Sequence, residues 1–154
     1  MTLYLVQHAE ARSKEEDPSR SLSDEGRENI TKVAAFVKGL KIEVRHILHS
    51  GKMRALQTAQ ILEEYIQSER GVAEADGLAP MDDPGIWSVR LAEMSENTMI
   101  VGHLPHLGKL STLLLCGSKE KDIISFQMGN IFCLKRSAEG NWMVEWLIKP
   151  GMFT

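Results

Sequence analysis

Short apolar runs that open and close between polar segments constrain the fold of this chain most. Residues 3–6 form one such run and residues 99–102 form another. Runs this short indicate strands of a sheet that is covered on both faces. Ligands bind such sheets in the crevice at the carboxyl ends of the strands. His8 and His103 follow the two runs, so we expect both histidines at that crevice although they lie far apart in the sequence.

Strand-like and helix-like segments alternate along the rest of the chain, with a polar loop expected over residues 11–22. The expected helices are residues 23–40, 53–67, 83–94 and 105–115. The expected further strands are residues 44–49, part of 72–78, 131–135 and 142–148. The last two alternate around a turn, which predicts an antiparallel hairpin. We therefore expect one α/β domain over residues 1–154, a three-layer α/β/α sandwich whose mostly parallel sheet has an antiparallel edge.

The charge composition gives no sign of a nucleic-acid or membrane partner. The chain has 18 Lys plus Arg against 21 Asp plus Glu, a net charge of -3 with the signs interspersed, so no basic stripe is present. The first apolar run is too short for a signal peptide, and no stretch approaches membrane-spanning length. Cys116 and Cys133 lie in apolar segments and are expected to be buried free thiols. These features favour a cytoplasmic protein.

Four segments resemble the motifs of the histidine phosphatase superfamily. Residues 5–11 are similar to its Arg-His-Gly signature, and residues 20–26 to the Arg-x-Leu-Thr-x-x-Gly that follows it. Residues 50–59 resemble its Ser-Pro-x-x-Arg-Ala-x-Gln-Thr-Ala segment, and residues 101–107 its Val-Gly-His-Asn-Pro segment. The order, the spacing and the short length most resemble the SixA-type phosphohistidine phosphatases, over essentially the whole chain. The resemblance implies a phosphoglycerate mutase-like fold that needs no cofactor and no metal.

The resemblance also implies a role for each matched residue. His8 is the expected nucleophile, which forms a phosphohistidine that water then hydrolyses. Arg54 and His103 are expected to bind the phosphoryl oxygens and stabilise the transition state, with Arg20 as a further phosphate clamp from the loop. Gln7 stands where the family has an arginine, so we expect it to reach the phosphate with one neutral hydrogen bond.

Other residues keep alternatives open. His103 with His106, and His46 with His49, have a spacing that metal ligands also use, but neither pair has a third ligand at suitable spacing, so zinc is the weaker interpretation. Gly51 replaces the proline of the resembled motif, and Leu104 replaces its asparagine. Neither change removes a proposed nucleophile or charge.

The expected reaction is hydrolysis of phosphohistidine on a protein, such as a phosphotransfer domain. Its labile P–N bond needs less help from a general acid, and the only candidates, Asp82 and Asp83, are better explained as a loop and a helix N-cap. The short central region, residues 67–98, leaves little chain for a lid, which favours a histidine on a protein surface. The alternatives are a small-molecule phosphomonoesterase using His8, or a non-catalytic phosphate- or phosphoprotein-binding module in which Gln7 marks lost turnover.

Overall fold

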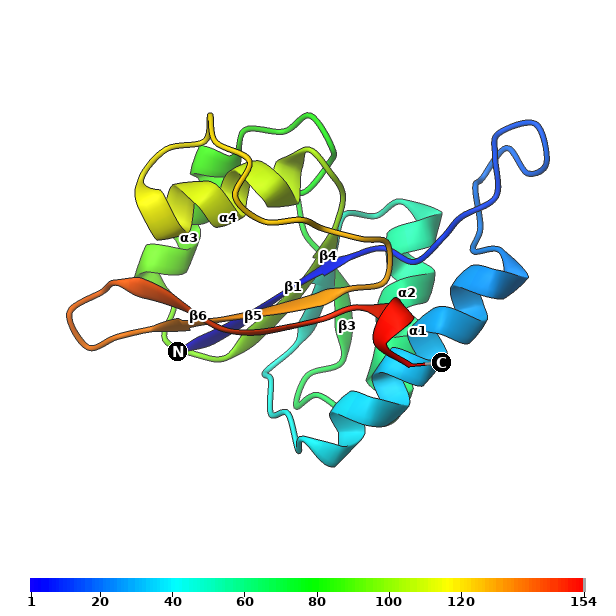
Figure 1. Ribbon diagram of the computed structural model, residues 1–154, viewed down its shortest axis with the longest axis horizontal. Coiled ribbons are helices and arrows are strands. Elements are labelled where there is room, and N and C mark those ends of the chain that lie inside the picture. The colour runs from blue at the N-terminus through cyan, green and yellow to red at the C-terminus, as the bar shows by residue number, and fades with distance from the viewer. Residues whose placement is uncertain (154) are drawn as a thin grey trace.

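A computed structural model describes residues 1–153 and shows strands alternating with helices (Figure 1). The strands are β1 (Thr2–Gln7), β2 (Ile47–His49), β3 (Val72–Glu74), β4 (Thr98–Gly102), β5 (Ile131–Arg136) and β6 (Trp142–Ile148). The helices are α1 (Asp24–Gly39), α2 (Met53–Ile66), α3 (Pro84–Glu93) and α4 (His106–Cys116), followed by the short 3-10 helix η1 (Pro150–Met152).

The six strands form one sheet in the order β3-β2-β4-β1-β5-β6. The strands β3, β2, β4 and β1 run parallel, whereas β5 and β6 pair antiparallel at one edge. This arrangement confirms the predicted mostly parallel sheet with an antiparallel edge. In the β1–β4 register Gln7 pairs with Gly102, so the two strands end level with each other. Residues that follow them therefore meet at the same crevice.

Helices α1 and α2 cover one face of the sheet, and α3 and α4 cover the other (Figure 1). Side chains alternate along β1: Tyr4 and Val6 join the core beneath α1 and α2, and Leu3 and Leu5 join the core beneath α3 and α4. Burial of each Leu or Val side chain contributes roughly 1.5–3 kcal/mol. The predicted three layers are confirmed, and their two cores fix the central strand that leads to His8.

Two expectations of detail are wrong. The second strand is only Ile47–His49, because the backbone N–H of Arg45 donates to the carbonyl of Asn97 outside any strand. Cys116 is exposed because it ends α4 at the surface, whereas Cys133 is buried in β5, and both are free thiols. Within residues 1–153, no helix combines the length and the apolar character that crossing a bilayer requires.

Candidate active site

The two strand-end histidines lie side by side at the carboxyl edge of the sheet. The ring centroids of His8 and His103 are 5.0 Å apart, and the ring planes are inclined by 49°. The backbone N–H of His8 donates to the carbonyl of Gly102 (3.0 Å), which extends the β1–β4 pairing up to the histidine itself. Both side chains are buried, with 8% of His8 and 2% of His103 exposed. The predicted convergence of the two residues is confirmed, and their chemical roles stay predictions.

The backbone next to His8 fixes one tautomer of its ring. Nδ1 lies 2.7 Å from the carbonyl oxygen of Ala9, and because a carbonyl only accepts, Nδ1 carries the proton and Nε2 keeps a lone pair. Burial lowers the pKa of His8 to about 4; the hydrogen bond to Ala9 opposes this shift, and the charges of Arg54 and Arg20 add to it. At neutral pH the ring is therefore uncharged, and Nε2 is available as a nucleophile.

His103 presents a second neutral ring at this edge. Burial lowers its pKa to about 3, and the neighbouring His8, Arg54 and Lys52 lower it further. Its Nε2 shares a 2.6 Å hydrogen bond with the hydroxyl of Ser50, and its Nδ1 is buried without a partner within residues 1–153. Negative charge placed beside the ring raises the pKa of a histidine. A bound phosphoryl group would therefore favour the protonated, donating form of His103.

Arg54 reaches the same site from the first turn of α2. Its charge lowers the pKa of both His8 and His103, and the pKa of its own guanidinium is lowered by burial and by Arg20. Its Nε is buried and has no hydrogen-bond partner among the described residues. Buried donors in proteins are normally paired, so an anion at this edge would complete the hydrogen bonding of Arg54.

Thr58 ties the helix that carries Arg54 to the segment that follows His8. Its Oγ1 accepts from the backbone N–H of Ala9 (3.0 Å) and donates to the carbonyl of Arg54 (2.7 Å). The side chain is fully buried, so this bridge fixes the position of the nucleophile relative to the arginine. The bridging role of Thr58 was not predicted from the sequence. The only sign of its importance there is its place in the motif at residues 50–59.

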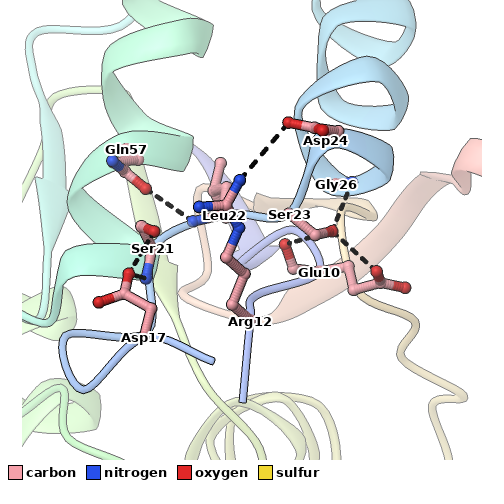
Figure 2. Close-up of polar contacts among 9 residues, drawn as sticks. All are labelled: Glu10, Arg12, Asp17, Ser21, Leu22, Ser23, Asp24, Gly26 and Gln57. Carbon is pink, nitrogen blue, oxygen red and sulfur yellow. Dashed lines mark hydrogen bonds and ion pairs between the residues drawn. The ribbon is translucent and has the colours of Figure 1, made fainter. Parts of the chain in front are cut away.

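Polar side chains anchor the loop between β1 and α1 at its C-terminal end, just before α1 begins (Figure 2). Gln57 of α2 accepts from the backbone N–H of Leu22 (2.7 Å), and the carboxylate of Glu10 accepts from the Ser23 hydroxyl (2.7 Å). Ser23 in turn accepts from the N–H of Gly26 and begins α1, as predicted. A Cβ on Gly26 would lie 2.1 Å from the Glu10 carbonyl oxygen, so the close approach of helix and loop requires glycine.

Arg20 is carried by this loop rather than by the sheet. Its backbone lies in the left-handed region with φ 51°, and its Nε donates to the carbonyl of Arg12 (3.1 Å). Its charge contributes to the lowered pKa values of His8 and Arg54. The structure thus brings Arg20 within electrostatic reach of His8 and Arg54, and its role as a phosphate clamp stays a prediction.

Gln7 ends β1 immediately before the nucleophile and is buried, with 8% of the residue exposed. Its carbonyl, like that of His8, accepts from the N–H of Gly129. Its side-chain Oε1 is buried and finds no partner within residues 1–153. The backbone of Gln7 is therefore fixed and its Oε1 acceptor is unsatisfied among these residues, and its contact with phosphate stays a prediction.

The two mid-chain carboxylates have structural partners. Asp83 caps α3 by accepting from Gly85 N–H (2.9 Å), and Asp82 accepts from Ala79 N–H (2.9 Å). This confirms their interpretation as a loop and a helix N-cap. They raise the pKa of the buried His106 against the lowering caused by burial.

The two histidine pairs that were considered as metal ligands, His103 with His106 and His46 with His49, are not joined by a third ligand within residues 1–153. Within residues 1–153, no group of three or more His, Cys, Asp or Glu side chains could hold a metal ion. His49 accepts a hydrogen bond from the N–H of Gly51 (3.0 Å) through Nδ1.

A groove of about 800 Å³ is lined in part by Leu104 and Pro105, the two residues that follow His103 in the chain. It runs between the first turns of α3 and α4 and the segment 119–126, and its lining mixes apolar and charged side chains, among them Phe126 and Lys109. Another cavity, of about 540 Å³, is lined by residues that include Arg45 and Asn97. Among the described residues, neither His8 nor His103 lines either cavity, and the larger groove is the one whose lining follows His103 in the chain.

Comparisons with known proteins show which family the chain matches and which proteins it is similar to. The family model of the histidine phosphatase superfamily (branch 1) matches residues 3–103. The chain is 24% identical to the phosphohistidine phosphatase SixA of Escherichia coli (strain K12), over 97% of this chain and 94% of that protein. Among solved structures it is similar to the protein histidine phosphatase SixA complexed with tungstate, with a TM-score of 0.88, 24% identity and full coverage of both chains. It is also similar to the alpha-ribazole phosphatase from Shigella flexneri, with a TM-score of 0.79, 15% identity and 97% of both chains covered.

Proposed function

Because this chain belongs to the histidine phosphatase superfamily, we propose that it hydrolyses phosphohistidine on a phosphotransfer protein. The observation that carries the proposal is the state of His8: a buried, neutral ring with its proton on Nδ1, next to the charge of Arg54. The similarity to SixA supports this substrate class. The groove lined by Leu104 and Pro105, the two residues after His103, supports it as well, since it is a surface that a protein substrate can contact. A cytoplasmic location is proposed from the sequence features alone.

In the proposed reaction, Nε2 of His8 attacks the phosphorus of the substrate phosphohistidine. A bond from Nε2 to phosphorus forms while the P–N bond to the substrate ring breaks. The substrate ring leaves as neutral imidazole because its other nitrogen carries the proton. Water then attacks phosphorus, the bond to His8 breaks, and phosphate leaves with both protons of the water.

Charge stabilisation in both steps falls to Arg54 and His103, with Arg20 and Gln7 as further donors. The phosphoryl group spreads negative charge over its equatorial oxygens, and fixed donors around them lower the barrier. Neutral imidazole is a good leaving group, so neither step needs a carboxylic acid. This agrees with the use of Asp82 as a backbone acceptor.

The test is incubation with a phosphotransfer protein that carries ³²P on its histidine. Wild type should release phosphate, and His8→Ala should release none above the spontaneous rate. His46→Ala is the matched control, because His46 is a half-exposed histidine outside the site, and it should behave like wild type. Equal release by wild type and His8→Ala would refute the nucleophile assignment.

Two alternatives have observations of their own. The fold likeness to alpha-ribazole phosphatase favours a small-molecule phosphomonoesterase, which would hydrolyse sugar or nucleotide phosphates faster than the phosphoprotein. The neutral Gln7, which stands where the resembled signature has arginine, favours a phosphate-binding module, which would bind vanadate or phosphate without hydrolysing phosphohistidine. Rates on both substrate classes, measured together with binding, separate the three functions.

A further inference from the structure

The segment that joins β2 to α2 carries an exposed lysine to the catalytic edge. Gly51 in this segment has φ 89°, a conformation that glycine adopts readily and that a proline, fixed near −65°, cannot reach. A Cβ on Gly51 would lie 2.3 Å from Oε1 of Glu74, but this atom ends a flexible side chain that can move, so the positive φ is what requires glycine. The turn therefore depends on glycine, and it determines the position of the next residue, Lys52.

This turn places Lys52 next to the hydrogen bond between Ser50 and His103. The Ser50 hydroxyl lies 2.6 Å from Nε2 of His103, and it accepts from the backbone N–H of Lys52 at 3.4 Å. The backbone of Lys52 is thus joined to His103 through a single hydroxyl group. The charge of Lys52 also lowers the pKa of His103, after the larger effects of burial, His8 and Arg54.

The ammonium of Lys52 is available at this edge. Within residues 1–153, Lys52 is exposed and makes no ion pair with a carboxylate. Lys52 is the N-cap of α2 but forms no side-chain cap, so local structure leaves the side chain without a partner. By contrast, Gln7 brings no charge to the other side of the histidines, and its Oε1 is unpartnered.

Resting on the proposed phosphatase function, we propose that Lys52 is a phosphate-binding residue of this site. Its ammonium contacts a phosphoryl oxygen from the β2–α2 side and supplies positive charge that the neutral Gln7 does not. In the ligand-free site, Arg54 and Arg20 act on the neutral His8, and Arg54 and Lys52 act on the neutral His103. The doubly charged phosphoryl group is matched by positive charge from the helix side rather than from the end of β1.

Lys52→Gln and Lys52→Arg test the contact, with Lys38→Gln as control. Lys38 is an exposed lysine in the last turn of α1, so its loss changes the net charge equally. Two quantities are measured for each protein: kcat/KM on the phosphohistidine protein, and the Kd of inorganic phosphate by calorimetry. Lys52→Gln should lose about tenfold in both, the size expected for one charge-assisted contact. Lys52→Arg should stay within about threefold of wild type, because it keeps the charge. Lys52→Gln values equal to those of Lys38→Gln would overturn the proposal.

Gln7→Arg, combined with Lys52→Gln, tests whether the two positions supply the same charge. Gln7→Arg should raise kcat/KM more in the Lys52→Gln background than in wild type. The effects of two residues that supply positive charge to the same phosphoryl group are not additive. Equal gains in kcat/KM in the two backgrounds would overturn the inference that Lys52 supplies the charge that Gln7 lacks.

The two measurements also separate this inference from the proposed function. If wild type hydrolyses no phosphohistidine but binds phosphate through Lys52, the phosphatase proposal fails and the binding residue stands. If wild type is active and Lys52→Gln is unchanged in both quantities, the phosphatase stands and this inference fails. A wild type that neither hydrolyses phosphohistidine nor binds phosphate overturns both.

Discussion

His8 should stay uncharged at pH values well below that at which an exposed histidine becomes protonated. Burial lowers the pKa of His8 from 6.5 to about 4. With a pKa of about 4, about 97% of His8 is neutral at pH 5.5, against only about 9% of a histidine with an ordinary pKa. The structure therefore predicts roughly ten times more of the nucleophilic form at pH 5.5 than an unperturbed ring would supply.

The measurement is an NMR titration of protein labelled with ¹⁵N at histidine, from pH 8 to pH 4. The His8 signals are identified by their loss in His8→Gln, and they should show the Nδ1-protonated tautomer throughout the upper range. Added phosphate should raise the pKa of His103, because negative charge then faces its ring. A His8 midpoint between pH 6 and pH 7 in the free protein would refute the reasoning, since burial would then not control its proton.

The lowered pKa of His8 also predicts that the folded protein is less stable in acid. Between pH 6.5 and about pH 4 the unfolded chain binds a proton at His8 that the folded chain does not, so the free energy of unfolding falls as the pH falls. From pH 7 to pH 5 the loss from His8 is roughly 2 kcal/mol. His103, with its pKa lowered to about 3, acts in the same direction. Urea unfolding at both pH values should show a smaller loss in His8→Gln than in wild type.

Three substitutions extend these predictions. Arg54→Ala should lower kcat/KM by about 100-fold or more, because it removes a donor from the developing phosphoryl charge, while thermal unfolding shows an intact fold; near wild-type turnover would end its role as a clamp. Gln7→Arg should raise kcat/KM on one phosphohistidine substrate about fivefold, since a charged donor is about twice as strong as a neutral one; a folded but slower variant would mean that the glutamine itself is a working part of the site. Thr58→Val should lower the free energy of unfolding by about 1–3 kcal/mol, because the buried N–H of Ala9 loses its acceptor; urea unfolding measures this, and no change in stability would contradict the bridge.

The place of the site could be predicted from the sequence because of what ends each apolar run. His8 and His103 follow strands that are too short and too apolar to be anything but buried, and parallel strands bring their carboxyl ends to one edge. The contacts that hold the site together could not be predicted. Ser50 meets His103 across 53 residues of sequence, and Thr58 meets Ala9 across 49. Both contacts depend on how closely α2 packs against the sheet, which hydrophobic spacing does not reveal.

The turn at Gly51 and the strand at residues 44–49 show the same limit. A glycine tolerates most backbone conformations, so its identity alone does not indicate that Gly51 adopts φ 89° and places Lys52 at the catalytic edge. Val44 is apolar and buried, as a strand residue would be. Arg45, however, bonds to a loop, and only the tertiary structure decides between a strand and a buried connection.

The loop that carries Arg20 and the strand that leads to His8 belong to regions of different local stability. The strand β1 is paired on both sides and buried on both faces, so its amides should exchange with solvent only through global unfolding. Residues 12–20 are held mainly by exposed hydrogen bonds between Ser and acidic side chains, and such segments open at much lower free energy. Limited proteolysis should therefore cut first within residues 12–20, giving a nicked protein that keeps its nucleophile in place while Arg20 moves away. The proposed contact of Arg20 with phosphate would thus be separable from the rest of the site without any substitution.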